Sequence, residues 1–474
     1  MQLHRNGGVM WEWTAAEQAA AVRSGRVTAV ELVESHLERI AAVNPVVNAI
    51  TQPLAERALA EAARADRDGA RGPLAGVPFT VKESIAIGGV PTTHGAVRFE
   101  DFVAPRDAPP VARLRAAGAI PIGHSNMPTL TLAGMHTRSE LFGDTVNPWD
   151  PAVTPGGSSG GDGVAVATGM AALGLGNDSG GSVRIPASFC GVAGLKPTSG
   201  RFPADHRIGP DDPPLGAQLF VVDGPLARTV GDLRSAFEVL AGTSPRDPRA
   251  VPVPLTGPPV PRRVAVVADP GGTGVDPVVG AAVEDAAAVL SDAGYEVVEA
   301  DVPALDQALS AYGHMLMTEF APSWPVVRTL LGAEGDRYIG MSMAKAGPVD
   351  VTEYLRLTGV LLGVRRAWAE FLDRFPLVLG PVFTARPPEP GLESRSREGH
   401  DLVTGAMRLC TATSFAGLPA VAVPTGVVDG LPVGVQLIGR AYREDVCLDA
   451  AEVVQRVVTP RTPAGSRPPR RCRP

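Results

Sequence analysis

The sequence is poor in aromatic residues and in cysteine. Aromatic residues make up 5% of the chain, and only 4 of its 474 residues are cysteines. Cys190, Cys410, Cys447 and Cys472 form no CxxC pair, and they are too scattered for the disulfide framework of a small secreted protein. We interpret them as reduced thiols. Cys190, in SFCGV, has no base beside it, so we interpret it as a buried structural residue rather than a nucleophile.

Long hydrophobic runs and an excess of positive charge are also missing. No uninterrupted run of about 18 apolar residues occurs, and the start, MQLHRNGGVMWEWTAAEQ, has no apolar signal region. The net charge of −7 argues against general binding to nucleic acid or to an anionic membrane, because phosphates attract a basic face. We therefore expect a cytoplasmic protein with no nucleic-acid or membrane partner.

The remaining composition is that of a globular protein. Hydrophobic residues make up 45% of the chain and charged residues 20%, which excludes a disordered or fibrous class. The length is sufficient for one large domain or a few ordinary ones. No repeat and no Gly/Ser linker divides the chain, so we expect a single large domain.

Residues 1–70 predict a helical arm packed on that domain. Thr28 and Glu31 fit a capping box at a helix start. Apolar residues then follow at helical spacing, at Val30, Val33, Leu37 and Ile40.

Residues 71–458 predict the α/β domain. The short apolar runs GVPFTVKES, GAIPIGHSN and LGLGND suit buried strands, and RRVAVVAD, a helix over 275–290 and YEVVEADVP suit a βαβ-like unit. Residues 204–260 are rich in proline and weakly periodic. The fold class is α/β, with a mostly parallel or mixed twisted sheet covered by helices on both faces.

Two further features lie near the end of the chain. Asp429-Gly430 predicts a tight hairpin that closes one edge of the sheet. Residues 459–474 form a tail rich in proline and arginine, which we interpret as a frayed terminus rather than a binding segment.

Glycine is concentrated in TPGGSSGGDG and NDSGGSVRIP, which place Ser158 and Ser182 in unusually bare backbone. Neither stretch has the pattern of a phosphate-binding or dinucleotide-binding loop. The alternative is an oxyanion hole, in which the N–H groups of Gly180, Gly181 and Ser182 converge on one oxygen beside a serine hydroxyl.

A serine nucleophile needs a base. None of the 8 histidines has the setting of an α/β-hydrolase triad. Lys82 ends the apolar run GVPFTVK, and burial would favour its uncharged amine. The competing interpretation is a buried ion pair of Lys82 with Glu83 or with an aspartate.

These motifs together resemble the amidase signature family. The resemblance rests on GVPFTVKE, on the stretch from TPGGSSGGDG through NDSGGSVRIPASFCGVAGLKPT, and on GLPAVAVPTG followed by LPVGVQLIG. It implies a Ser-cisSer-Lys triad, with Ser182 as nucleophile, Ser158 as the bridging serine after a cis peptide bond, and Lys82 as base. It also implies an acyl-enzyme and an oxyanion hole at Ser179, Gly180, Gly181 and Ser182. No metal or cofactor is expected.

We expect several residues near the triad to hold its loops in place. We expect Asp178 and Arg184 to pair and hold the nucleophile loop, with a surface salt bridge as the alternative. Ser159 is a further neighbour of the triad. Asp162 falls in the first turn of a helix, where a carboxylate complements the helix dipole. Ser179, GHSNMP and Ser414 depart from common family residues, which affects the expected substrate rather than the triad.

Two segments are candidates for a substrate pocket. TLTLAGMHTRS supplies Thr131, Met135 and His136, and AYGHMLMTEFAPSW supplies Tyr312 and Met315. The alternatives are a hydrogen-bonded loop histidine for His136 and ordinary core packing for the second segment. If these residues face the site, the substrate is a small to medium apolar or aryl carboxylic amide, which yields an acid and ammonia or an amine.

Three other functions are consistent with the same motifs. The first is the glutaminase subunit of a tRNA-dependent amidotransferase, although residues 311–345 do not resemble the tyrosine-containing loop of that subunit. The second is hydrolysis of a urea-derived acyl amide of the allophanate type, although no extra C-terminal domain is present. The third is an inactive scaffold, which the intact triad disfavours. The sequence leaves the oligomeric state open, a homodimer included.

Overall fold

The computed structural model describes residues 9–208, 211–457 and 462–463. Most of the predicted tail over 459–474, including Cys472, therefore lies outside the described residues. Within these ranges, no helix is both long and apolar enough to cross a membrane.

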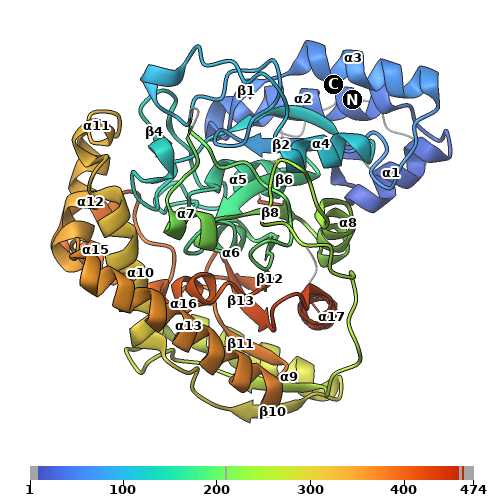
Figure 1. Cartoon of the computed structure of the whole chain (residues 1–474). Coiled ribbons are helices and arrows are strands. Elements are labelled where there is room, and N and C mark those ends of the chain that lie inside the picture. The colour runs from blue at the N-terminus through green and yellow to red at the C-terminus, as the bar shows by residue number, and fades with distance from the viewer. Residues whose placement is uncertain (1–8, 209–210, 458–461, 464–474) are drawn as a thin grey trace.

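An 11-stranded mixed sheet runs through the molecule in the order β1-β3-β2-β6-β8-β7-β12-β13-β11-β9-β10 (Figure 1). Pairing is parallel along β3-β2-β6 and along β11-β9-β10, and antiparallel between the other neighbours. The predicted α/β class with a large mixed sheet is confirmed. The strands are β1 (Ile50–Pro53), β2 (Pro78–Lys82), β3 (Ile120–Ser125), β6 (Leu173–Asp178), β7 (Ala193–Lys196), β8 (Val222–Ala227), β9 (Arg263–Val266), β10 (Glu296–Glu299), β11 (Leu377–Pro381), β12 (Ala420–Val428) and β13 (Leu431–Gly439).

The hairpin at Asp429-Gly430 is present, but its predicted place in the sheet is wrong. β12 and β13 flank the turn, where Asp429 and Gly430 have φ of 50° and 80°. β12 also pairs with β7, and β13 with β11, so the hairpin lies inside the sheet. Turn chemistry fixes the local pairing of two strands, whereas their outer partners depend on distant parts of the chain.

Helices cover both faces of the sheet. Successive side chains of β11 point to opposite faces of the sheet. Leu377 and Leu379 belong to the hydrophobic cluster of one face, and Val378 belongs to a cluster of the other. The first face carries α1 (Ala15–Arg23), α4 (Pro109–Ala116), α8 (Val230–Leu240), α9 (Pro277–Asp292) and α17 (Glu444–Gln455). The second face carries α2 (Ala29–Val47), α3 (Ala55–Asp68), α5 (Gly160–Ala167), α6 (Arg184–Cys190), α10 (Leu305–Phe320), α13 (Val351–Arg374) and α16 (Arg408–Ala416).

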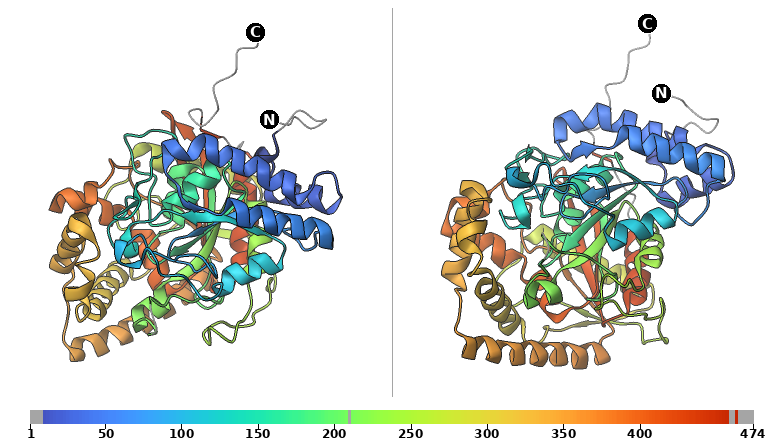
Figure 2. Two further views of the ribbon diagram at one scale, coloured as in Figure 1. Left: turned by 90° about the horizontal axis from the view of Figure 1, so that it is seen from above. Right: turned by 45° about the horizontal axis from the view of Figure 1, so that its top comes forward.

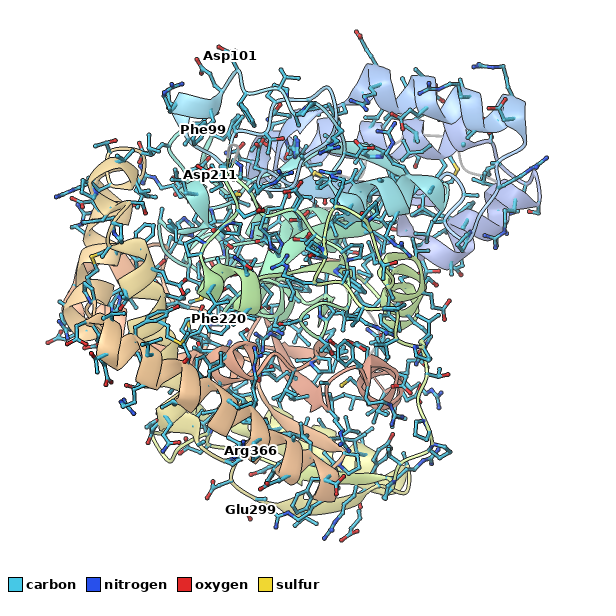
Figure 3. The ribbon with its side chains drawn as sticks, viewed as in Figure 1. Phe99, Asp101, Asp211, Phe220, Glu299 and Arg366 are labelled. Carbon is cyan, nitrogen blue, oxygen red and sulfur yellow. The ribbon has the colours of Figure 1, made fainter. Side chains whose placement is uncertain are left out.

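The remaining elements lie in the connections. They are η1 (Met10–Glu12), η2 (Val97–Phe99), η3 (Thr129–Thr131), β4 (Arg138–Ser139), β5 (Gly143–Asp144), α7 (Leu215–Phe220), α11 (Trp324–Val327), α12 (Gly332–Lys345), α14 (Leu392–Arg395) and α15 (Arg397–Ala406). Phe220, at the end of α7, is fully buried, whereas Glu299 lies on the last strand at the margin of the molecule (Figure 3).

The N-terminal segment contains the predicted helices, grouped on one side of the molecule (Figure 2). The capping box of Thr28 and Glu31 is confirmed at the start of α2. The segment also contains β1, which adds to the sheet beside β3. Leu32 and Val33 of α2 share a hydrophobic cluster with Val164 of α5, so the arm contributes directly to the core of the domain.

The predicted βαβ unit is confirmed as β9, α9 and β10, with β9 and β10 parallel. The weakly periodic stretch over 204–260 contains α7, α8 and the inner strand β8. β8 carries Gly224 and Pro225 among its six residues. This composition concealed the strand at the level of sequence.

Candidate active site

The site lies where β2 and β6 end against the start of α5. All five residues of β2 are buried, so the strand serves both faces of the sheet. Phe79 and Val81 join the hydrophobic cluster of the first face. Because side chains alternate along a strand, Thr80 and Lys82 point to the second face, toward α5. The strand thus carries a lysine into the interior.

Glycines in β6 let α5 approach the sheet closely. A Cβ at Gly174 would lie 2.8 Å from Cβ of Asp162, and a Cβ at Gly176 would overlap Oγ of Ser159. The two glycines are two residues apart along the strand, so both lie on the face that packs against α5. Their missing side chains leave the space that Ser159 and Asp162 occupy.

Ser158 lies just before α5, in a loop pressed against residues 135–137. The peptide bond between Gly157 and Ser158 is cis, as the family resemblance implies. A Cβ at Gly157 would overlap the carbonyl oxygen of Met135, and a Cβ at Gly160 would overlap Oγ1 of Thr137. Thr137 also donates a hydrogen bond to the carbonyl oxygen of Gly156, at 2.7 Å. The glycines therefore allow the close packing that fixes Ser158.

The amine of Lys82 is fully buried among neutral hydrogen-bond partners. Its Nζ lies 2.6 Å from Oγ of Ser158, 3.0 Å from Oγ of Ser159 and 2.6 Å from Oδ1 of Asn177. Burial lowers the pKa of Lys82 to about 7, and the nearby carboxylates, Asp162 first, limit the decrease. Burial therefore favours the uncharged form of this amine.

The competing ion pair of Lys82 with Glu83 is not formed. One oxygen of Glu83 accepts hydrogen bonds from Thr51 and Gln52, at 2.6 and 2.7 Å. The other accepts from the hydroxyl and the backbone N–H of Thr93. Glu83 thus links β1 to the loop that contains Thr93, and its carboxylate forms no ion pair with Lys82.

Ser182 lies half-buried between β6 and α6, and its loop contacts that of Ser158 directly. The backbone N–H of Ser159 donates to the carbonyl oxygen of Ser182, at 3.1 Å. Gly181 has a φ of 128°, and a Cβ there would lie 2.6 Å from Cδ1 of Ile185. Only glycine adopts this conformation readily. The two serine loops are thus linked by a main-chain hydrogen bond.

The N–H groups predicted for the oxyanion hole are not equivalent. The N–H of Gly181 donates to Oδ1 of Asp178, at 2.8 Å. Among the hydrogen bonds of the described residues, none has the N–H of Ser179, Gly180 or Ser182 as donor. These three N–H groups stay candidate donors of the predicted oxyanion hole.

Asp178 and Arg184 form a fully buried ion pair, at 2.9 Å, rather than a surface one. Arg184 also donates to Gln436, to the carbonyl oxygen of Cys410 and to Ser414. Burial alone would raise the pKa of Asp178, but the guanidinium of Arg184 outweighs it and holds the pKa well below its usual range. The pair anchors the loop that contains Ser182, because Asp178 accepts from Gly181 and Arg184 begins α6.

Asp162 lies in the first turn of α5, as predicted, but its carboxylate binds the sheet rather than the helix end. Oγ1 of Thr80 donates to its Oδ1 at 2.7 Å. Burial raises the pKa of Asp162 to about 6, against the opposing effect of the hydrogen bond from Thr80.

Four of the five predicted pocket residues, all except His136, fall into three groups. Met135 abuts the Ser158 loop through its carbonyl oxygen, and Tyr312 donates a hydrogen bond to the carbonyl oxygen of Ser179, at 3.1 Å. Thr131 is half-buried in η3. Met315 is fully buried in the core cluster that contains Trp368, so its assignment to a pocket wall is corrected to core packing.

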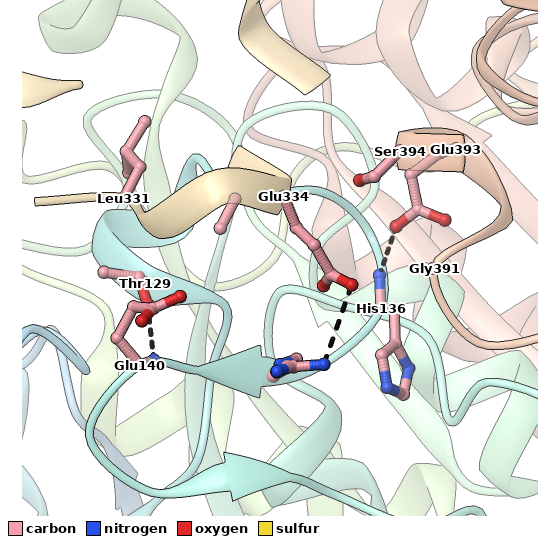
Figure 4. Close-up of a pocket in the computed structure, with 10 residues that line it drawn as sticks. Thr129, His136, Glu140, Leu331, Glu334, Gly391, Glu393 and Ser394 are labelled. Carbon is pink, nitrogen blue, oxygen red and sulfur yellow. Dashed lines mark hydrogen bonds and ion pairs between the residues drawn. The ribbon is translucent and has the colours of Figure 1, made fainter. Parts of the chain in front are cut away.

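His136 has hydrogen-bond partners on both ring nitrogens. They are Thr154 and Asp144, each at 3.0 Å. His136 also lines the cavity in Figure 4, beside Glu334 of α12 and Glu393 of α14. Lys82, Ser158 and Ser182 are not among the described residues that line this cavity. His136 is thus both a hydrogen-bonded loop residue and a cavity residue.

Asn177 is the site residue that sequence reasoning missed. Its Oδ1 accepts from Lys82, and its Nδ2 donates to Oγ of Ser84 at 2.8 Å. The one available signal was its position just before Asp178 at the end of a strand.

The amidase family model matches residues 31–448 of the chain. An indoleacetamide hydrolase of Bradyrhizobium diazoefficiens is 41% identical over 457 residues, which cover 94% of this chain and 87% of that protein. A glutamyl-tRNA(Gln) amidotransferase subunit from a Roseiflexus species is 35% identical, over 95% of this chain and 97% of that protein.

Solved structures agree with these relatives. The 6-aminohexanoate cyclic dimer hydrolase in complex with substrate has a TM-score of 0.84 and 29% identity, over 97% of this chain and all of that one. A bacterial aryl acylamidase of the amidase signature family has a TM-score of 0.82 and 26% identity, over 95% and 97% of the two chains. The chain belongs to the amidase signature family and is an enzyme that hydrolyses C–N amide bonds.

Proposed function

We propose that this enzyme hydrolyses an apolar or aryl carboxylic amide through an acyl-enzyme on Ser182, with Lys82 and Ser158 relaying the proton. The observation that carries this proposal is the contact of 2.6 Å between the buried amine of Lys82 and the hydroxyl of Ser158. A buried amine without a carboxylate partner is suited to act as a base near neutral pH.

In the proposed reaction, Ser158 gives its proton to Lys82 and takes the proton of Ser182. Oγ of Ser182 then forms a bond to the amide carbonyl carbon. The resulting oxyanion accepts hydrogen bonds from the N–H groups of Ser179, Gly180 and Ser182, and losing one such donor typically costs about 2.7–4 kcal/mol.

The same groups then transfer the proton in the opposite direction. Lys82 returns a proton through Ser158 to the leaving nitrogen, the C–N bond breaks, and ammonia or an amine departs. Water attacks the ester on Ser182 with the relay again as base, which releases the acid and restores the serine. The proton balance closes without a metal ion or cofactor.

The choice of an aryl substrate rests on the relatives. Two proteins named indoleacetamide hydrolase are 41% and 40% identical to this chain, and a structural neighbour is named an aryl acylamidase. Indole-3-acetamide is therefore the first substrate to test.

The test is a screen of the purified enzyme against indole-3-acetamide, aliphatic amides, amino-acid amides and urea-type amides. We expect the highest kcat/KM with an aryl or apolar amide, and no acid product from the Ser182→Ala variant. Equal hydrolysis by the wild type and this variant would refute the nucleophile. Preference for a urea-type amide would refute the substrate class.

The amidotransferase relative supports a second candidate function, in which glutamine is the amide and a partner receives the ammonia. Incubation with glutamine, alone and with the other subunits and glutamyl-tRNA, separates the two functions. Glutamine hydrolysis that requires those components would favour the amidotransferase role.

A further inference from the structure

The hydrogen bonds around Lys82 determine which way its amine faces. An uncharged lysine amine has two hydrogens and one lone pair, whereas the ammonium has three hydrogens and no lone pair. Three oxygens surround Nζ, from Ser158, Ser159 and Asn177. Which of them receives a hydrogen depends on what else each oxygen does.

Asn177 is able only to accept at this position. Its Nδ2 donates to Oγ of Ser84 at 2.8 Å, so its Oδ1 is the atom that lies 2.6 Å from Lys82. A carboxamide oxygen carries no hydrogen. One hydrogen of the Lys82 amine is therefore committed to Asn177.

Ser159 also acts as an acceptor toward Lys82. Its hydroxyl donates to the backbone carbonyl oxygen of Asn177, at 3.2 Å, and this donation uses its single hydrogen. The contact of 3.0 Å between Lys82 and Ser159 therefore takes the second hydrogen of the amine.

Ser158 is the remaining partner, and its hydroxyl is free to reverse direction. When Lys82 is charged, the three oxygens accept its three hydrogens. When Lys82 is neutral, Asn177 and Ser159 hold both hydrogens, and the lone pair faces Oγ of Ser158 at 2.6 Å. The amine is then arranged to accept a proton from Ser158 alone.

We propose that Asn177 is a positioning residue that, together with Ser159, directs the lone pair of uncharged Lys82 at the hydroxyl of Ser158. This inference rests on the proposed function of Lys82 as a base. Asn177 then determines that Lys82 takes its proton from Ser158.

The charged groups near Lys82 do not provide this orientation. Asp162 on α5, Asp178 at the end of β6 and Asp223 on β8 interact with Lys82 electrostatically. Asp162 is bound to Thr80, Asp178 to Arg184 and Asp223 to His206. The contact from β6 to Nζ is thus a neutral amide, which orients the amine without a full charge that would keep it protonated.

The test is the pH dependence of kcat and KM for Asn177→Asp and Asn177→Leu, measured with the best substrate of the screen. In Asn177→Asp, the added charge should raise the pKa of Lys82 by about 1–3 units. The acidic limb of kcat/KM should move to higher pH by that amount, with about a fivefold or greater loss at pH 7.

Asn177→Leu should shift the acidic limb of the kcat/KM profile in the opposite direction. Loss of an acceptor for the ammonium lowers the pKa of Lys82 further, so the limb should move to lower pH. The amine is no longer held, so the plateau of kcat should fall by about 10- to 100-fold with little change in KM.

Thr168→Val is the control, because it removes a buried hydroxyl whose hydrogen bond goes to the carbonyl oxygen of Val164 in α5 and not to Lys82. Its pH profile should match that of the wild type. Ser84→Ala gives a milder test, since it frees the amide of Asn177 without touching Lys82, and it should lower kcat by a smaller factor. It carries the test if the Asn177 variants do not fold.

The outcomes separate this inference from the proposed function. Activity in the wild type and none in Ser182→Ala, with unshifted limbs in the Asn177 variants or, if these do not fold, an unchanged kcat in Ser84→Ala, would overturn the role of Asn177 alone. Full activity in Lys82→Met would overturn the proposed function itself.

Discussion

At the scale of single residues, the site combines a buried ion pair with a buried lysine whose charged form is disfavoured. Arg184 and Asp178 are both fully buried and neutralise one another, whereas Lys82 is buried among neutral oxygens. Desolvation opposes an unpaired charge far more than a paired one. The first arrangement therefore fixes the loop that contains Ser182, and the second favours the uncharged form of the Lys82 amine.

The ion pair predicts a large loss of stability in Asp178→Asn. The variant leaves the guanidinium of Arg184 buried without its counter-charge, and breaking such a pair typically costs about 3–5 kcal/mol. Chemical denaturation at pH 7 should show this decrease in the free energy of unfolding.

The pH dependence of stability checks the sign of this contribution. The pKa of Asp178 is lowered by folding, so its stabilisation is present above the ordinary carboxyl pKa and is lost as the pH falls through the lowered folded value. The difference between the wild type and Asp178→Asn should shrink in acid. A constant difference at pH values well below the ordinary carboxyl pKa would contradict the assignment.

Site residues in short motifs could be predicted from sequence, whereas their hydrogen-bond partners could not. Lys82, Ser158 and Ser182 lie in distinctive stretches, and the structure brings Lys82 and Ser158 into contact. Asn177 begins the stretch NDSGGSVRIP, but nothing in that stretch indicates its partner, because Lys82 is 95 residues away along the chain. Met315 has an apolar spacing that suits a pocket as well as a core, and only three-dimensional packing separates the two.

At the scale of elements, the site depends on how closely α5 approaches β6. Gly174 and Gly176 leave the space that Asp162 and Ser159 occupy. The sequence predicted the strand and the glycine-rich loop, because local propensity and turn chemistry determine both. It did not predict the place of the β12-β13 hairpin inside the sheet, because strand order is set by long-range packing.

Gly176→Ala is predicted to push α5 away from the sheet. The added methyl group would overlap Oγ of Ser159, and overpacking of this kind typically costs about 1–3 kcal/mol. Displacement of Ser159 should also lower kcat. Thermal unfolding and steady-state kinetics measure the two effects.

Gly359→Ala is the matched control for this substitution. Gly359 lies within α13, and an added Cβ would meet no atom within 4 Å. This variant should be more stable by about 0.4–1 kcal/mol, because alanine reduces the entropy of the unfolded chain. Equal effects of the two substitutions would show that close approach of α5 is not the cause.

At the scale of the whole molecule, the N-terminal arm and the rest of the chain share one sheet and one core. β1 pairs with β3, and the backbone N–H of Asn126 donates to the carbonyl oxygen of Ala49 at 2.9 Å. The sequence predicted the helices of the arm, but the short strand between two of them was too brief to be recognised.

Removal of residues 1–70 is therefore predicted to prevent stable folding of the remainder. The deletion exposes the edge of β3 and removes the α2 side chains from the hydrophobic cluster that they share with α5. Circular dichroism and size-exclusion chromatography should show an aggregated or unfolded product, whereas the full chain should unfold in one transition. A soluble, cooperatively folded remainder would contradict the shared core.

The most direct measurement is the mass of the enzyme after rapid mixing with an arylacetyl ester or amide and an acid quench. We expect one acyl group on the peptide that contains Ser182, with a formation rate that rises through pH 7 as Lys82, whose pKa is about 7, loses its proton. Ser182→Ala should acquire no acyl group. Turnover with no adduct under any quench condition, an adduct on another residue, or a formation rate that falls across this pH range would contradict a serine activated by neutral Lys82.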